Sequence, residues 1–272
     1  MSTATDTAPA PEAPEVTSRA EEHQAVPAID ETLQARIGLM ITPAIFAVLL
    51  IALVYVWATT QFDATMGRIL NPARLVSQFR EQLFITFWST VFVIGIAIPL
   101  GIALTRPALR RFAPPVLTLA SSGQAIPAYG LIVLFLVLLG QGTRTAIVAL
   151  TVFALIPVLR NTMVGLDQVD KPTIEAARGM GLSQMQVLRR IELPLAVPVI
   201  LAGVRTALII NVGMATLAFL IGGGGLGVTI NSSLKLNRPV AVFIGGALVA
   251  LLALAIDFTA ALAERYLRPK GI

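Results

Sequence analysis

Long runs of apolar residues dominate this 272-residue chain and limit what it can fold into. An α-helix rises about 1.5 Å per residue, so about 20 apolar residues cross the hydrocarbon core of a bilayer. Hydrophobic residues make up 56% of the sequence and charged residues 13%, whereas about 25% of an ordinary soluble domain is charged. A soluble core of this size could not hide so much apolar surface. The sequence therefore predicts an all-α integral membrane protein.

Six regions are long and apolar enough to be transmembrane helices. They run over residues 39–60, 83–105, 113–140, 146–164, 195–221 and 240–262. The third is too long and too interrupted for one simple span, and Pro127 predicts a helix broken near its middle. The sequence leaves open whether this region crosses as one broken span. If it did not cross, every later segment would lie on the opposite side.

Basic residues set the expected orientation. With the N-terminus inside, 13 of the 20 Lys and Arg residues fall on inner segments and six on outer ones. Because cytoplasmic loops carry an excess of basic residues, we expect both termini in the cytoplasm. Residues 1–36 hold seven acidic and two basic residues and show no apolar periodicity. That composition predicts a disordered acidic cytoplasmic tail.

Composition also argues against several classes of function. The chain has no cysteine and one histidine, His23, so disulfides, thiol catalysis and Cys- or His-based metal sites are not expected. The glycines at 222–225 and 227 lack the Lys-Ser/Thr that follows in a phosphate-binding loop, and we expect this glycine-rich loop to close the external mouth, where backbones pack tightly. No carboxylate pair or Ser/Lys pair fits a catalytic template. We expect neither enzyme activity nor a cofactor in this chain, and the net charge of +5 is assigned to the inner face of a membrane rather than to nucleic acid.

The segment between the fourth and fifth predicted spans has the signals of two short helices. Asp170 is expected to cap a helix and Pro172 suits its first turn, and Gly181 can end that helix in the left-handed conformation. Ser183 with Gln186 fits a capping box for a second helix. Together these signals predict two short helices joined by a sharp turn, with the fifth span opening afterwards at Pro194.

This segment is unusually apolar for a cytoplasmic loop. Apolar residues recur at helical spacing at Ile174, Ala177, Met180, Leu182, Met185 and Leu188. Exposed apolar patches usually mark a partner site. An amphipathic helix lying on the inner leaflet, with Arg189 and Arg190 at the headgroups, explains the periodicity equally well.

A spaced motif favours the partner site. It reads Glu175-Ala176-Ala177, three residues, Gly181, nine residues, Ile191, one residue, Leu193-Pro194. This motif resembles the signature loop of binding-protein-dependent ABC importer permeases. The resemblance extends over residues 80–266 and is greatest to permeases for the quaternary-ammonium osmoprotectants glycine betaine, choline and carnitine. It implies an ATPase-coupling loop made of Glu175, Ala176, Ala177, Gly181, Met185, Ile191, Leu193 and Pro194.

The resemblance also implies an architecture and a set of partners. A five-helix type I permease core would occupy 80–266, after an extra helix and external loop at 37–79 and before a short cytoplasmic tail at 267–272. Two ATPase subunits, which bind the ATP and Mg, would dock on the loop. A second permease subunit, the same chain or a related one, and an extracytoplasmic solute-binding protein would complete an importer in a bacterial cell membrane. The resemblance implies that Glu175 helps fix the first short helix and its turn.

Other functions stay open at this point. One alternative is an ABC permease for another small solute, such as an amino acid. A free-standing channel or secondary transporter is another, although it would leave the motif unexplained.

Two charged residues lie inside predicted spans. Arg205 is about 16 Å along the fifth span from Pro194, and Asp257 is about 12 Å along the sixth from Arg265. A charge at the bilayer centre costs about 2.5–3.5 kcal/mol on insertion scales. We therefore hypothesise that Arg205 and Asp257 pair or share one polar cavity, the alternative being that each faces water or a helix end separately.

Solute recognition leaves few signals in the sequence. A quaternary ammonium group is normally held by aromatic rings, and only Trp88 and Tyr129 lie near the expected path, where ordinary packing is the default. We expect selectivity to reside in the binding protein. Small and polar residues on the fifth span are predicted to line a weakly selective path: Asn211, Gly213, Met214 and Thr216.

Overall fold

The computed structural model describes residues 31–267, with side chains from Ile41 to Tyr266. The chain divides after Ile41 into two units, and the helix bundle belongs to the second, which starts at Thr42. The expected tail over residues 1–30 lies outside the described residues, as do residues 268–272. Residues 31–36, which were expected to be disordered, are the helical start of α1 (Glu31–Thr59).

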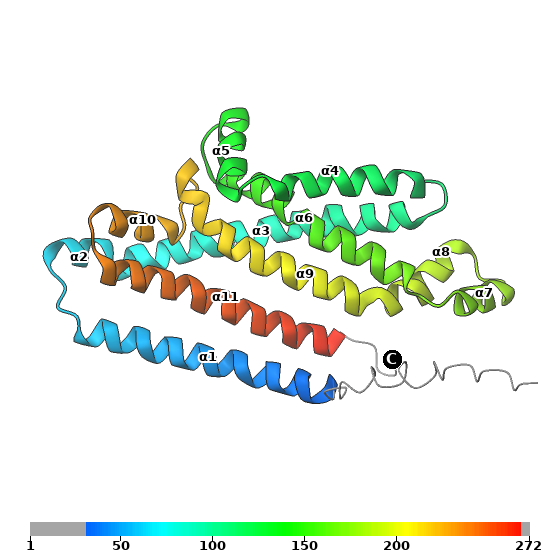
Figure 1. Cartoon of the computed structure of the whole chain (residues 1–272), viewed down its shortest axis with the longest axis horizontal. Coiled ribbons are helices and arrows are strands. Elements are labelled where there is room, and N and C mark those ends of the chain that lie inside the picture. The colour runs from blue at the N-terminus through cyan, green and yellow to red at the C-terminus, as the bar shows by residue number, and fades with distance from the viewer. Residues whose placement is uncertain (1–30, 268–272) are drawn as a thin grey trace, which may run out of the picture. The chain divides into compact units, whose positions relative to one another are not determined.

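Every regular element in the described part of the chain is a helix (Figure 1). The remaining long helices are α3 (Pro72–Thr105), α6 (Thr143–Asp167), α9 (Leu193–Ala215) and α11 (Pro239–Leu267). The short α-helices are α2 (Ala64–Ile69), α4 (Ala113–Ala125), α5 (Ala128–Leu139), α7 (Lys171–Gly179), α8 (Gln184–Val187) and α10 (Gly227–Lys235). Two 3₁₀ turns, η1 (Arg110–Phe112) and η3 (Thr216–Ile221), and a π-helix, η2 (Leu188–Glu192), complete the described elements.

Five helical stretches in the described range are long and apolar enough to span a bilayer, and the bent α4–α5 pair is a sixth if the pair crosses as one broken span. The prediction of an all-α membrane protein with about six spans is confirmed. The break in the third region falls at Ile126–Pro127, where the helix axis turns by 100°. Proline disfavours the helical conformation at the preceding residue, and Ile126 accordingly has an extended ψ of 130°.

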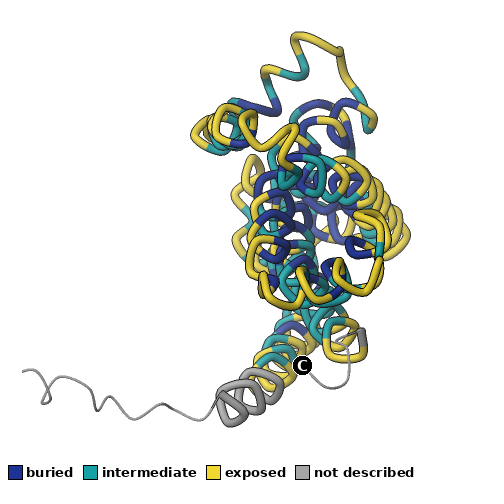
Figure 2. The backbone as a smooth tube through the Cα atoms, turned by 90° about the vertical axis from the view of Figure 1, so that its right-hand side faces the viewer, coloured by how far each residue is buried: buried dark blue, intermediate teal, exposed yellow. Residues whose placement is uncertain are grey.

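The core lies between α3, α6 and α9. In the most apolar 18-residue stretch of α6, 56% of the residues are buried, against 6% in the corresponding stretch of α1. One cluster joins Val93 and Ala97 of α3 to Ala154 and Val158 of α6 and Ala207 of α9. Figure 2 shows buried backbone in the interior of the helix bundle, with exposed backbone around it. The central helices are therefore held mainly by protein, and α1 offers most of its apolar surface to lipid.

The C-terminal part of α1 packs on α11. Leu53 shares a cluster with Ala241 and Ile244 of α11 and with Met66 and Leu70, at and just after α2. The residues of α1 from Thr42 onward therefore join the rest of the helix bundle through α11.

The fifth span starts earlier than predicted. Helix runs without a break from Gln184 to Ile221, over 38 residues, so Pro194 is the second residue of α9 rather than the opening of a span. The π-helix η2 joins α8 to α9. Its wider turn accommodates the proline ring, which would clash with the carbonyl four residues earlier in a regular α-helix.

Candidate functional site

The segment α7–α8 forms a tight helix–turn–helix at one end of the bundle, while α2 and α10 lie at the other (Figure 1). Gly181 has φ +83°, a conformation that costs a residue with a Cβ about 1–2 kcal/mol. Leu182 N donates to Ala177 O at 3.3 Å and Gly181 N to Arg178 O at 2.9 Å, which is the Schellman pattern of a helix C-terminus. The turn therefore lies where the glycine predicted it.

The two helix N-termini differ in how they are capped. Ser183 and Gln186 form the predicted capping box, with Ser183 N donating to Gln186 Oε1 at 2.8 Å and Gln186 N to Ser183 Oγ at 3.4 Å. Asp170 occupies the N-cap position of α7 but caps no backbone N–H. Its Oδ2 accepts instead from the Thr173 hydroxyl at 3.1 Å. The prediction that the Asp170 side chain caps this helix is therefore wrong.

Four of the six apolar residues of the segment form a buried and an exposed pair, while Ile174 and Leu182 are half-buried. Met180 is 75% exposed and Met185 is 55% exposed, whereas Ala177 and Leu188 are buried. Leu188 packs with Leu166 at the end of α6. The buried set holds the segment to the bundle, and the two methionines remain on the surface.

The other motif residues lie at the surface or half-buried. Glu175 and Ala176 are exposed, and Ile191, Leu193 and Pro194 are half-buried. Within the described residues no hydrogen bond or ion pair of the Glu175 side chain appears. The expectation that Glu175 fixes the turn therefore has no contact behind it, because the backbone bonds of the turn are made without it.

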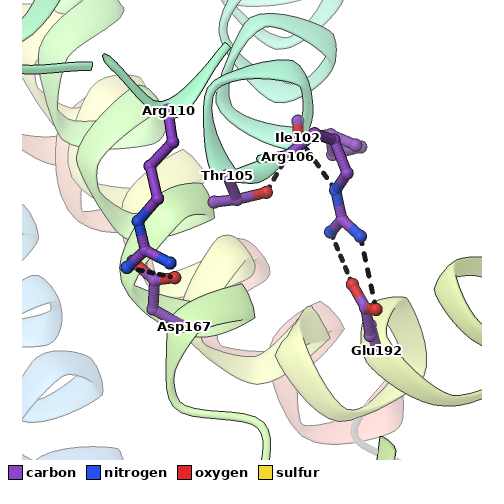
Figure 3. A network of polar contacts seen from close by, with 6 residues as sticks. All are labelled: Ile102, Thr105, Arg106, Arg110, Asp167 and Glu192. Atoms are coloured by element: carbon purple, nitrogen blue, oxygen red, sulfur yellow. Dashed lines mark hydrogen bonds and ion pairs between the residues drawn. The ribbon is translucent and has the colours of Figure 1, made fainter. Parts of the chain in front are cut away.

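An ion pair ties this segment to α3. The carboxylate of Glu192, in the π-helix, accepts from Arg106 Nη2 at 2.5 Å and from Nη1 at 3.3 Å (Figure 3). The Glu192 side chain is 6% exposed and that of Arg106 32%. Arg106 follows the last residue of α3, and its Nε donates to Ile102 O at 3.4 Å. The two-point geometry fixes the guanidinium plane as well as the distance.

A second pair nearby is more open. Arg110 Nη2 lies 3.4 Å from Asp167 Oδ1, with the side chains 66% and 47% exposed. Exposed pairs of this kind contribute about 0–1 kcal/mol. Of the two pairs in Figure 3, Arg106–Glu192 is the one that can hold the segment in place.

Arg205 and Asp257 lie in contact across α9 and α11. Arg205 Nε donates to Asp257 Oδ1 at 2.6 Å and Nη2 to Oδ2 at 2.9 Å. Glu264 Oε2 lies 3.8 Å from Arg205 Nη1. The two charges predicted to pair or share a cavity thus form a direct pair, with a second carboxylate one and a half to two helical turns further along α11.

The four predicted path residues occupy different environments. Asn211 is fully buried and its Nδ2 donates to Thr90 Oγ1 at 3.1 Å, while Met214 is 8% exposed in the core. Thr216 is half-buried, and Gly213 is exposed. Asn211 and Met214 point into the packing of their own subunit, so in this conformation they present no surface to a solute.

At the opposite end from α7–α8, polar residues of α3 hold the glycine-rich loop. Gln82 is fully buried, and its Nε2 donates to Val212 O at 2.8 Å and to Thr216 Oγ1 at 3.0 Å. Leu226 N donates to Gln82 Oε1 at 3.2 Å. One amide side chain therefore joins α3, α9 and the loop.

Glycine is required at Gly225 for two reasons. Its φ is +86°, and an added Cβ would lie 2.6 Å from Gln82 Oε1. Gly225 N donates to Glu81 Oε2 at 2.9 Å. The loop thus makes close backbone contact with α3, in line with the reading of these glycines as a packing element rather than a phosphate cradle.

Sequence reasoning missed Arg106, Glu192 and Gln82. Each carried a signal, since Arg106 directly follows an apolar run and Glu192 directly precedes one. Gln82 borders the apolar run of the second span, where a polar side chain calls for a partner. The partners could not be named because they lie 86 residues apart for Arg106 and Glu192 and 130 apart for Gln82 and Val212.

Membrane-spanning helices around a central α6, with an exposed helix–turn–helix at one end, define a polytopic membrane protein of the all-α class. Residues 95–269 match the family model of binding-protein-dependent transport system inner membrane components. The chain belongs to this family and is the permease subunit of an ABC importer, a transport subunit rather than an enzyme. Permeases of this family work with a separate ATPase and a solute-binding protein.

The chain is similar in sequence to two curated relatives and in structure to one solved transporter. The chain is 40% identical over 202 residues to the glycine betaine/carnitine/choline transport system permease protein OpuCB of Bacillus subtilis, covering 74% of this chain and 92% of that protein. It is also 40% identical over 193 residues to the osmoprotectant import permease protein OsmY of Salmonella typhimurium, covering 71% and 82%. An inward-facing structure of the MetNI methionine ABC transporter superposes with a TM-score of 0.66 at 28% identity, covering 73% of this chain and 99% of that chain.

Proposed function

We propose that this permease imports quaternary-ammonium osmoprotectants of the glycine betaine, choline and carnitine type. The observation that carries the proposal is the 40% identity over 202 residues to a permease named for these three solutes. A choline permease of Bacillus subtilis at 39% and a carnitine permease of Listeria monocytogenes at 39% support the same solute class.

We further propose that the helix–turn–helix is the ATPase-coupling loop. The exposed methionines Met180 and Met185 supply adaptable apolar contacts for a cleft, and Gly181 sets the angle between the two helices. The remaining proposed loop residues are Glu175, Ala176, Ala177, Ile191, Leu193 and Pro194. The Arg106–Glu192 pair would pass movement of the loop to α3.

The proposed assembly has two ATPases, two permease subunits and one external binding protein. The excess of Lys and Arg on the α7–α8 side supports the orientation with that side in the cytoplasm. Residues 80–266 are assigned to the permease domain and residues 37–79 to an additional helix with its external loop. Among the four proposed path residues, Gly213 has the exposure that a lining residue needs.

Transport by the intact complex tests the solute. Vesicles containing the permease with its native ATPase and binding protein are given ATP and labelled glycine betaine, choline, carnitine or methionine. ATP-dependent uptake of at least one of the three quaternary amines, without methionine uptake, is the expected result. Uptake of methionine alone would reject the proposed solute class.

An amino-acid importer is the second candidate, because the solved structure that superposes on this chain is part of a methionine transporter. The lower identity of 28%, against 40% to the osmoprotectant permease, places it second.

A further inference from the structure

An open groove of about 600 Å³ lies on the face of α3 that points away from the core, beside the start of α6. It is lined chiefly by Arg80, Glu81, Phe84, Trp88, Phe92 and Arg144. This groove is at the end of the bundle opposite α7–α8, and neither the coupling loop nor the Arg205–Asp257 pair contributes to it.

The α3 wall of the groove is aromatic and exposed. Phe84, Trp88 and Phe92 are 52%, 39% and 47% exposed, and the Trp88 ring centroid lies 6.3 Å from that of Phe84 and 6.1 Å from that of Phe92. The opposite face of α3 carries its buried residues. These rings therefore form a continuous apolar wall that faces away from the subunit's own core.

The rim of the groove is basic. Arg80 and Arg144 are exposed, and among the described residues neither forms an ion pair. The Glu81 carboxylate is already engaged, because Oε2 accepts from Gly225 N at 2.9 Å and Oε1 from Ser77 Oγ at 3.2 Å. With two arginines and one carboxylate that already accepts two hydrogen bonds, the rim has a net positive charge and attracts an anion.

The rim and the wall are spaced like the parts of a phospholipid. Trp88 is about 12 Å and Phe92 about 18 Å along α3 from Arg80, at about 1.5 Å per residue. Arg80 precedes the apolar run that starts at residue 83, so the arginines lie at headgroup level and the rings at the level of the upper acyl chain. Arginine binds phosphate through two parallel hydrogen bonds, so Arg80 and Arg144 at this level suit the phosphate of a headgroup.

We propose that this groove is a binding site for an anionic phospholipid, with the phosphate held by Arg80 and Arg144 and an acyl chain lying along Phe84, Trp88 and Phe92. A quaternary-ammonium solute fits less well, since the basic rim repels its cationic group. This site does not depend on which solute the permease imports.

Photo-crosslinking in the intact importer tests the site. Trp88 is replaced by p-benzoylphenylalanine, and the complex is reconstituted in vesicles of equal phosphatidylglycerol and phosphatidylcholine. Mass spectrometry then counts the lipids attached to this chain. We expect at least about a fivefold excess of phosphatidylglycerol adducts, because each of the two arginines alone favours an anionic lipid by about that factor.

Matched variants separate the site from general effects. The double variant Arg80→Gln, Arg144→Gln should bring the adduct ratio to about one, while Arg80→Lys, Arg144→Lys should keep an excess because it retains the charges. Arg68→Gln with Arg74→Gln removes two charges near the same end but outside the groove, and should leave the excess intact. A crosslinker at Phe243, 43% exposed near the start of α11, should show no headgroup preference.

Three results would overturn the proposal: equal adducts of both lipids in the parent, an excess that survives the double glutamine variant, or crosslinks at position 88 to a second permease subunit or to solute instead of lipid. Assembly with the ATPase, measured on each variant, identifies any that fail to fold. For those, the lysine pair and the Phe243 position still decide the outcome.

Discussion

Arg205 on α9 and Asp257 on α11 are joined by two parallel hydrogen bonds, at 2.6 and 2.9 Å, between helices that each span the membrane. Neither charge could face lipid without a large cost. The pair therefore links the span that carries the proposed coupling loop to the last span in the described part of the chain.

Removing one partner should impair the permease more than exchanging both. Breaking a fully buried pair costs about 3–5 kcal/mol, and since Arg205 is 35% exposed we expect a smaller loss. Arg205→Asp and Asp257→Arg should each lower membrane level and uptake. The double exchange should recover part of both, since Glu264, 3.8 Å from Arg205 Nη1, would repel an aspartate at 205.

Glu264→Gln serves as the control, because its contact with Arg205 is long and partly exposed. It should leave uptake near normal. A double exchange no better than either single variant would remove the pairing as a functional contact.

The Arg106–Glu192 pair should be needed for coupling rather than for insertion. Glu192→Gln weakens a two-point, charge-assisted contact to neutral hydrogen bonding, so uptake and solute-stimulated ATP hydrolysis should fall several-fold while membrane level changes less. Arg110→Gln is the matched control, since its pair with Asp167 is exposed. Equal losses in both variants would mean that the Arg106–Glu192 contact has no special role.

Gly181→Val should uncouple transport, because a β-branched residue strains a φ of +83° by about 1–2 kcal/mol or more. Membrane level, ATPase binding and uptake are measured separately, and we expect normal level with reduced binding and uptake. Gly179→Val, at a helical position with no atom within 4 Å of an added Cβ, should be tolerated. Normal uptake by Gly181→Val at normal expression would contradict the docking assignment.

Gln82→Leu should destabilise the end of the bundle that holds the glycine-rich loop. The change leaves Leu226 N without its acceptor and Thr216 Oγ1 without its donor, and a buried polar group left unpaired costs about 1–3 kcal/mol. Thermal unfolding in detergent should show a lower midpoint. Gln141→Leu, at an exposed position, should not, and a midpoint unchanged in both would show that the Gln82 contacts contribute nothing.

Trp88→Leu and Tyr129→Leu, singly or together, should change the concentration for half-maximal uptake only modestly. Trp88 lies in the proposed lipid groove and Tyr129 is 57% exposed on α5, so neither is placed to select a solute. The measurement is uptake of glycine betaine or choline with the native binding protein. A change in the range of accepted solutes, at equal expression, would locate recognition inside this chain.

Local chemistry accounts for what could be predicted from the sequence. The break at Pro127, the turn at Gly181 and the Ser183–Gln186 box each depend on residues within a few positions, and each is present. The continuity of α8 with α9 was missed because Pro194 is a strong start signal that a π-helical turn can absorb. The short helices α2 and α10 were missed because they are too short to show a period.

Contacts between distant segments were harder to predict. Arg205 and Asp257 could be matched because two charges at similar depth in apolar spans need partners. Arg106, Glu192 and Gln82 lie at the ends of spans, where water or headgroups could equally have satisfied them. Only the packing of α3 against α6 and α9 brings these side chains to their partners.

The unbroken helix from Gln184 to Ile221 has a mechanical consequence. Its α-helical middle, α9, is a rod of 23 residues, about 35 Å long at about 1.5 Å per residue, and Arg205 holds this rod to α11 close to its midpoint. A rod held near its middle moves its two ends in opposite directions when it tilts. A push on Met185, in α8 just before one end of α9, would therefore move the glycine-rich loop beyond the other end in the opposite direction.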